Sequence, residues 1–155
     1  MKRFSLFFFS LLLTSQCHAA VIIGEVVSIA DGDTITVLQD RKQYKVRLAE
    51  IDAPEKKQPY GQKSKQALSD WVFGKYVNVE QVDTDRYGRI VGKVYVGGIY
   101  VNAEMVRNGH AWVYPKYAKD ENLYQLEKLA REQRLGLWAL QEDQRVPPWE
   151  WRKRK

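Results

Sequence analysis

The chain has 155 residues, a formal net charge of +6 at pH 7 and a single cysteine. This length fits one domain that can bury a core of its own. The lone cysteine excludes an intramolecular disulfide, and the modest excess of basic residues suits a polyanionic partner or an anionic surface.

Residues 1–19 have the pattern of a secretory signal peptide. Lys2 and Arg3 precede an apolar run over 4–13, which is too short to span a bilayer as a helix. Small residues at its end offer a cleavage site after Ala19. We expect cleavage and export, to the periplasm or to the medium, without stable membrane association. The alternative is an uncleaved N-terminal anchor.

Short apolar runs separated by turn residues predict five β-strands, the first three forming consecutive antiparallel pairs. Their ranges are 21–30, 34–39, 43–48, 76–82 and 89–96. This strand count favours a small Greek-key barrel of the OB-fold type, although closure of the barrel is not visible in the periodicity.

Three helices are predicted from apolar spacing and terminal signals. The first covers 60–73, the second 102–108 with Asn102 as its N-cap, and the third 121–134 with Asp120 as its N-cap. The fold class is therefore α+β, a five-stranded barrel with about three helices. We expect one domain over 20–140 and a basic C-terminal tail over 141–155, poorly ordered from Pro147 onward.

Carboxylates occur at two places that a hairpin would bring together. The segment DGDT (31–34) has the composition of a simple hairpin turn. If the second and third strands pair, however, Asp33 at the start of one lies near Asp52, just beyond the end of the other. Two converging carboxylates repel each other unless a cation lies between them, and a hard divalent ion bound by oxygen suits such a site.

Residues beside these carboxylates could complete a hydrolytic site. Arg47 ends the third strand, and Glu55 follows Asp52 across a proline. A carboxylate base, a metal and an arginine are the groups that phosphodiester hydrolysis requires. Arg89 could add a second guanidinium that grips phosphate oxygens, although a single arginine is more often a solvated surface charge. Trp112 and Tyr114 could stack on bases or belong to the core.

Four motifs, in order, resemble the staphylococcal (micrococcal) nuclease family. They are DGDT at 31–34, RLAEIDAPE at 47–55, DRYGR at 85–89 and VNAEMVRNGHAWVY at 101–114, and the resemblance spans about 21–138. It implies an OB-fold nuclease that depends on Ca²⁺, cuts DNA and RNA with little sequence selectivity and leaves 3′-phosphate ends. We expect single-stranded or frayed substrates to be preferred and the protein to act as a monomer.

The resemblance also implies roles for individual residues. Asp33 and Asp52 would bind the metal through their carboxylates and Ala53 through its backbone carbonyl, with Asp31 and Thr34 supporting these ligands. Glu55 would be the general base or would orient the attacking water. The remaining positions would hold the substrate: Arg47 and Arg89 the phosphate, and Tyr87, Trp112 and Tyr114 the nucleotide.

Two departures from the family pattern affect these expectations. Trp112 stands where a tyrosine is familiar, and the segment KKQP after Glu55 is short. The alternatives are a non-catalytic nucleic-acid-binding barrel and an exported basic protein that binds anionic envelope polymers. The second of these would need the charge but no converging carboxylates. The first is disfavoured by the joint presence of the proposed catalytic and metal-binding side chains, Asp33, Arg47, Asp52, Glu55 and Arg89.

Overall fold

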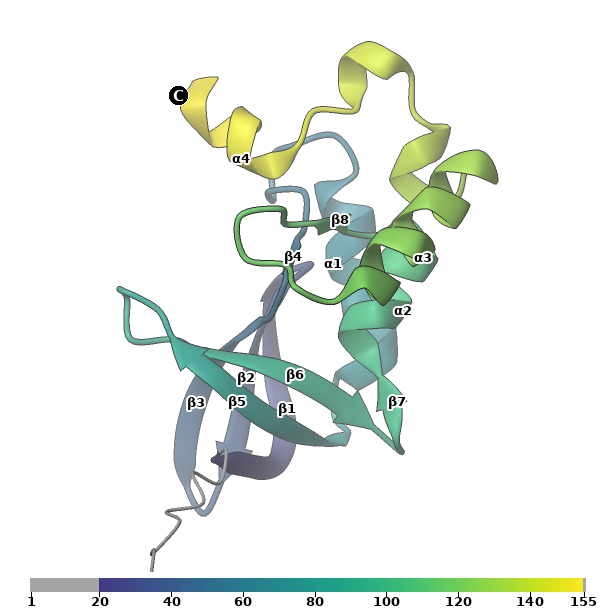
Figure 1. Cartoon of the computed structure of the whole chain (residues 1–155). Helices are drawn as coiled ribbons and strands as arrows, with labels where there is room; N and C mark the ends of the chain where they lie inside the picture. Colours follow the sequence, from purple (N-terminus) through teal and green to yellow (C-terminus); the bar gives the residue numbers. More distant parts are fainter. Residues whose placement is uncertain (1–19, 155) are drawn as a thin grey trace, which may run out of the picture.

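A computed structural model describes residues 20–154 (Figure 1). The predicted signal peptide, residues 1–19, lies outside the described residues. The strands are β1 (Val21–Asp31), β2 (Thr34–Gln39), β3 (Lys42–Leu48), β4 (Ile51–Asp52), β5 (Tyr76–Thr84), β6 (Ile90–Val96), β7 (Ile99–Tyr100) and β8 (Trp112–Val113). The α-helices are α1 (Gly61–Val72), α2 (Val101–Arg107), α3 (Glu121–Glu132) and α4 (Pro148–Trp151), and short 3₁₀ helices cover Gly136–Ala139, Glu142–Gln144 and Arg152–Arg154.

Five strands form a closed barrel, which confirms the predicted fold class. The antiparallel order is β3-β2-β1-β5-β6, and a parallel pairing between β3 and β6 closes the ring. In that pairing Val46 faces Ile90 and Leu48 faces Gly92. Gly92 also leaves room for the neighbouring strand β5 on its other side, because a Cβ at this position would collide with the Val79 side chain. Alternate residues of the strands fill the interior, as the period of two predicts.

The helices lie at one end of the barrel (Figure 1). Residues of α1, α2 and α3 continue the barrel core, and Leu68, Met105 and Leu123 are among the side chains fully buried there. Asp120 caps α3 as predicted, because its carboxylate accepts the backbone N–H of Asn122 at 2.9 Å. Within residues 20–154, no helix has the length and apolar character needed to cross a bilayer.

Asn102 does not cap α2, so that prediction is wrong. The helix begins one residue earlier, and the Asn102 side chain is buried inside the fold. Its amide donates to the carbonyls of Ala49 (3.0 Å) and Gly92 (3.2 Å) and accepts the N–H of Val94 (3.1 Å). Asn102 therefore ties the turn after β3 to β6, and this turn leads into the candidate site.

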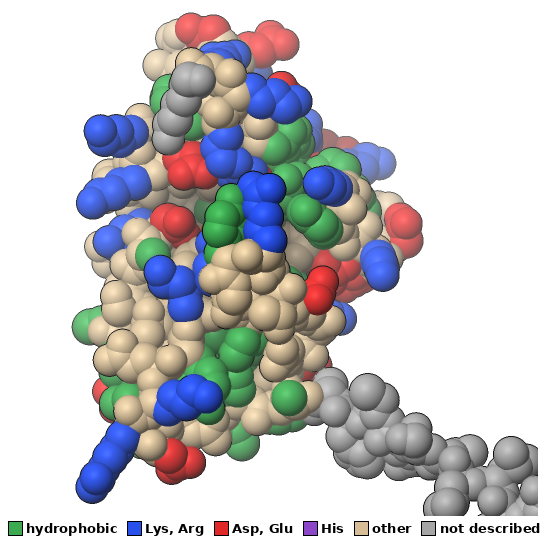
Figure 2. Space-filling view, turned by 90° about the vertical axis from the view of Figure 1, so that its left-hand side faces the viewer, with side chains coloured by type: hydrophobic (Ala, Val, Ile, Leu, Met, Phe, Trp, Pro, Cys, Tyr) green, Lys and Arg blue, Asp and Glu red, His purple; other side chains and the backbone are tan. Residues whose placement is uncertain are grey.

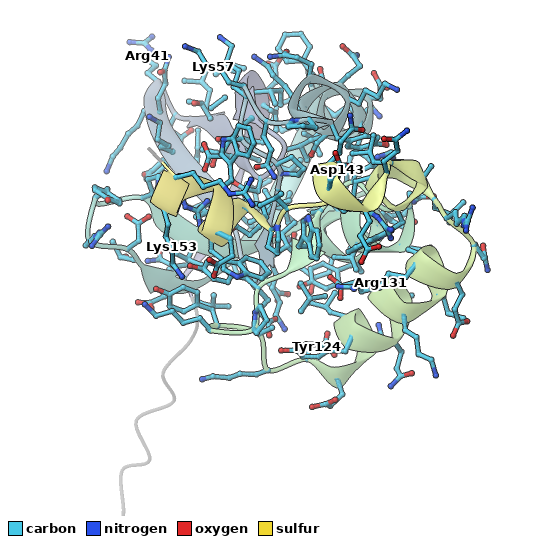
Figure 3. All side chains as sticks on the ribbon, turned by 90° about the horizontal axis from the view of Figure 1, so that it is seen from above. Arg41, Lys57, Tyr124, Arg131, Asp143 and Lys153 are labelled. Carbon is cyan, nitrogen blue, oxygen red and sulfur yellow. The ribbon has the colours of Figure 1, made fainter. Side chains whose placement is uncertain are left out.

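The C-terminal segment is ordered against the fold, contrary to our prediction. The Gln58 side chain donates to the carbonyl of Val146 at 2.5 Å, and Trp149 stacks on Tyr114. Trp149 also contacts a second cluster of buried residues that includes Trp112 and Trp138. Composition alone predicts a solvated basic tail. The segment packs on the fold instead, because the Trp149 ring covers apolar surface. In two views, α4 lies above the end of the barrel that carries β4 (Figures 1 and 3).

Candidate active-site cleft

A cleft of about 1060 Å³ opens at this end of the barrel. Side chains from the β1–β2 turn, the β3–β4 region, the β5–β6 loop, the segment after β8 and the C-terminal 3₁₀ turn all line it. On the face shown in Figure 2, Lys and Arg side chains are widely spread, with acidic side chains between them. The residues that line the cleft likewise include both acidic and basic side chains.

Arg47 holds the two predicted metal-binding carboxylates together. In the β2–β3 ladder Thr34 pairs with Arg47, so Asp33 lies beside the end of β3. The Arg47 guanidinium donates to Asp33 Oδ1 at 2.6 Å and to Asp52 Oδ1 at 2.9 Å. The predicted convergence of Asp33 and Asp52 is therefore confirmed. Although burial favours the neutral form of Arg47, these carboxylates raise its pKa above the usual range.

Asp33 is buried and held from several sides. Thr34 Oγ1 donates to Oδ1 at 2.9 Å, and the Ala53 N–H donates to Oδ2 at 2.8 Å. Burial alone would raise the pKa of Asp33, but Arg47 and these donors lower it below the usual value. Thr34 therefore contacts a proposed metal ligand, and the lowered pKa of Asp33 favours its charged form.

Asp31 and Gly32 shape the turn that carries Asp33. The Asp31 carboxylate accepts the Asp33 N–H at 3.2 Å, and burial together with the nearby Asp33 charge raises the pKa of Asp31 to about 7. A Cβ on Gly32 would collide with Ser64 Oγ and with the Ala53 side chain. Glycine in DGDT thus lets the turn pack directly against the segment that contains Ala53.

Asp52 and Glu55 share a partner that the sequence did not indicate. Arg152 donates to Asp52 Oδ2 at 2.7 Å, to Asp52 Oδ1 at 3.2 Å and to Glu55 Oε1 at 2.8 Å. The Asp52 side chain is 1% exposed and that of Glu55 is 30% exposed. No spacing rule connects Arg152 with residues about a hundred positions earlier, and a tail predicted to be poorly ordered offers no site residue.

Arg89 and Tyr87 lie on the β5–β6 loop at the edge of the cleft. Asp85 orders this loop, because its carboxylate accepts the N–H groups of Tyr87 (2.9 Å) and Arg89 (3.0 Å) and the Nε of Arg89 (2.6 Å). The guanidinium of Arg89 lies 5.6 Å from the centre of the Tyr87 ring. Both side chains line the cleft, and Tyr87 is largely exposed.

Tyr114 lines the cleft but Trp112 does not. Tyr114 is stacked by Trp149, with ring centres 5.2 Å apart and an interplanar angle of 4°. Trp112 is 7% exposed and packs edge-on against Trp138 at 4.4 Å. The expectation that Trp112 lines the nucleotide pocket is corrected here, because these contacts place its ring in the second core cluster. A core position was the alternative that the sequence left open.

Glu50 holds the segment after β8 beside the cleft. It has a positive φ of 66°, and its carboxylate accepts the backbone N–H groups of Lys119 (2.6 Å) and Asp120 (3.0 Å). Its carbonyl accepts the N–H of Tyr114 at 2.8 Å. Through these bonds the turn after β3 fixes both Tyr114 and the start of α3.

The donor set fits a hard divalent cation. Two buried carboxylates, Asp33 and Asp52, meet on one guanidinium, and the backbone of Ala53 lies beside them, since its N–H donates to Asp33. Oxygen donors of this kind are those that Ca²⁺ prefers, with waters completing its coordination. Among residues 20–154, no group of three or more His, Cys, Asp or Glu side chains is arranged to hold a metal. Backbone and water oxygens would therefore have to supply much of the coordination.

Comparisons with known proteins agree on one family. Residues 45–140 match the family described as staphylococcal nuclease homologue. A protein of Escherichia coli described as an uncharacterized endonuclease is 50% identical over 137 residues, covering 88% of each chain. A Shigella flexneri protein named micrococcal nuclease is 47% identical over 141 residues, covering 84% of this chain and 80% of its own. An uncharacterized endonuclease of Haemophilus influenzae is 43% identical over 142 residues.

Proposed function

The chain belongs to the staphylococcal nuclease family, and on that premise we propose that it is a calcium-dependent nuclease that cleaves DNA and RNA to products with 3′-phosphate ends. It is an enzyme that hydrolyses phosphodiester bonds; the ion, the range of nucleic acids and the products are the proposal. The observation that carries it is the Arg47 guanidinium joining Asp33 and Asp52 in a cleft that also contains Glu55 and Arg89.

Asp33, Asp52 and the Ala53 carbonyl are the residues that would hold the ion. When bound, Ca²⁺ would supply positive charge to the phosphate and lower the pKa of a coordinated water. Asp33 is suited to this role because its carboxylate is kept charged by Arg47 and Thr34. The Asp31 carboxylate accepts a hydrogen bond from the backbone N–H of Asp33.

Glu55 is the residue proposed to act on the attacking water. Its carboxylate lies at the cleft beside Asp52 and is partly exposed, so a water molecule can reach it. As a general base it would accept the proton of that water, and the same contact would orient the oxygen for attack. The short segment after Glu55 is held by its own bonds, since the Gln58 side chain accepts the Glu55 N–H at 3.1 Å.

Arg47 and Arg89 would stabilise the charge of the phosphate. Arg47 is fixed by two carboxylates and is only 17% exposed, so the site is organised before substrate arrives. Arg89 is fixed by Asp85 through Nε, which leaves its terminal nitrogens to form paired bonds with phosphate oxygens.

Tyr87 and Tyr114 would contact the nucleotide. Both rings line the cleft, and aromatic rings bind bases of any sequence by stacking. Stacking requires bases that are not already stacked in a duplex, which supports a preference for single-stranded or frayed regions. We propose that the protein acts as a monomer, since one chain supplies every proposed catalytic group.

We also propose that the protein is exported and works in the periplasm or outside the cell. The support is the sequence of residues 1–19, with its basic start and short apolar run. Fractionation of cells that express the full chain would test this. Export predicts activity outside the cytoplasm and a mature N-terminus at Ala20.

The catalytic proposal is tested with purified residues 20–155. Single-stranded DNA, duplex DNA and RNA are incubated with Ca²⁺, with Mg²⁺ or with a chelator, and the product ends are probed with a phosphatase. Cleavage that requires Ca²⁺ and leaves phosphatase-sensitive 3′ ends is the expected result. Products with 5′-phosphates, or equal rates with chelator, would contradict it. Binding without cleavage under every condition would instead favour a non-catalytic barrel.

A further inference from the structure

Arg152 reaches the proposed catalytic carboxylates from the far end of the chain. Its two terminal nitrogens contact both oxygens of Asp52, and one of them also contacts Glu55. Such a two-pronged contact is stronger and more specific than a single surface ion pair. The guanidinium therefore joins a proposed metal ligand to the proposed general base.

The part of the chain just before Arg152 is anchored. Val146 is bound by Gln58, Pro148 is buried, and the Trp149 ring is stacked on Tyr114 while it also contacts Trp112. These contacts place the following 3₁₀ turn at the cleft. The Arg152 side chain itself is 38% exposed, and its hydrogen bonds within residues 20–154 are those to Asp52 and Glu55. It can leave the site by changing its rotamer while the anchor stays in place.

The position of Arg152 conflicts with occupation of the same carboxylate by a metal. Asp52 Oδ1 already accepts from Arg47 and Arg152, and Oδ2 accepts from Arg152 at 2.7 Å. A divalent cation bound to Asp52 would need one of these oxygens. It would also lie next to the guanidinium, and like charges at this separation repel each other strongly when they are shielded from water.

We propose that Arg152 and the divalent cation compete for Asp52. Without the cation, Arg152 neutralises Asp52 and holds Glu55 away from other partners; binding of the cation displaces Arg152 and frees Glu55. This inference rests on the proposed role of Asp52 as a metal ligand. The C-terminal segment thereby couples cation binding to release of the general base.

The competition has a quantitative consequence. If part of the population has Arg152 on the carboxylates, the apparent affinity for the cation is reduced in proportion to the fraction that is free. Removing the Arg152 side chain abolishes that competition. A coupling of the usual size would strengthen cation binding by about 5- to 150-fold, and partial exposure of the pair favours the lower end of this range.

The test is calorimetric titration of Ca²⁺ into metal-free residues 20–155, into Arg152→Gln and into Lys153→Gln. Lys153 is the matched control, because it carries the same charge on the same turn and pairs only with Glu150, at 2.8 Å, among the described residues. We expect Arg152→Gln to bind Ca²⁺ at least about fivefold more tightly, and Lys153→Gln to differ from the parent by less than about twofold. A variant that ends at Trp151 should behave as Arg152→Gln does.

Several outcomes would overturn the competition. Equal Ca²⁺ affinities of Arg152→Gln and Lys153→Gln would mean that each substitution acts only through the loss of one positive charge. Weaker Ca²⁺ binding by Arg152→Gln than by the parent would mean that Arg152 helps to build the cation site and does not compete for it. Undetectable Ca²⁺ binding by all three proteins would remove the premise. Hydrolysis measured on the same samples separates the two proposals. Tighter binding by Arg152→Gln without any hydrolysis contradicts the proposed function alone, and hydrolysis with unchanged affinity contradicts the competition alone.

Discussion

Thr34 lies directly opposite Arg47 in the β2–β3 ladder. This register places the guanidinium of Arg47 on Asp33, one residue before Thr34, and lets the same side chain reach Asp52 across the next bend. A hairpin pairing therefore builds the centre of the candidate site. The register matters because a shift by one residue would turn Arg47 to the other face of the sheet.

Asp33→Asn should remove most of the affinity for Ca²⁺. The substitution deletes a buried carboxylate charge while it keeps the shape of the side chain, and affinity depends on the charge of the ligands. Calorimetry should show a loss of more than about tenfold. Asp143→Asn, on an exposed 3₁₀ turn, is the control. Retained affinity in Asp33→Asn would exclude Asp33 as a ligand.

Arg89→Ala should lower kcat/KM on single-stranded DNA by about a hundredfold, through turnover as well as affinity. The reason is the loss of a guanidinium that Asp85 fixes at the cleft. Arg107→Ala removes an exposed arginine on α2 that pairs with Glu104, and it should leave the rate close to that of the parent. A change in KM alone would make Arg89 a docking residue.

Asn102→Ala should destabilise the protein by about 2–5 kcal/mol, because the buried groups that it binds would lose their partners. Those groups are the carbonyls of Ala49 and Gly92 and the N–H of Val94. Urea unfolding measures the effect, with Asn122→Ala on the exposed side of α3 as the control. Equal midpoints for the two variants would contradict the assigned role.

The pKa of His110 should lie below its usual value of 6.5, because burial disfavours the charged ring more than the nearby Asp70 carboxylate favours it. Its Nδ1 is hydrogen bonded to the Tyr60 hydroxyl at 3.0 Å. The pKa is lower in the folded than in the unfolded state, so the unfolded state takes up the proton first and stability falls as the pH drops through about 6.5. Residues 20–155 contain no other histidine, so NMR titration of the ring is unambiguous. His110→Gln should flatten the dependence of stability on pH in this range. A ring pKa above 6.5 would show that burial does not dominate the titration of His110.

The sequence predicted those parts of the fold that depend on local pattern. Short apolar runs between turn residues located the five barrel strands, and the cap at Asp120 follows from local side-chain chemistry. Closure through β3 and β6 could not be predicted, because parallel pairing leaves no turn between the partners. The same N-cap rule that identified Asp120 failed for Asn102. The amide of Asn102 instead forms hydrogen bonds with buried backbone groups outside α2, such as the carbonyl of Ala49.

The residues of the candidate site also differ in whether a local sequence pattern could predict them. Asp33, Arg47 and Asp52 were predictable because one hairpin joins them. Arg152 was not, because basic residues after two prolines usually indicate a solvated tail, and only the packing of Trp149 on Tyr114 brings it to the cleft. Trp112 was ambiguous, since an aromatic ring suits a core and a base-binding surface equally well until its neighbours are known.

Cleavage and binding of single-stranded DNA by Glu55→Gln in Ca²⁺, measured beside the parent protein, decide whether Glu55 activates the attacking water. The amide keeps the size of the side chain but cannot accept the proton of the attacking water. We expect turnover to fall by at least about a hundredfold, with DNA affinity nearly unchanged. Equal turnover in the variant and the parent would contradict this role of Glu55 and would place the chemistry elsewhere in the cleft.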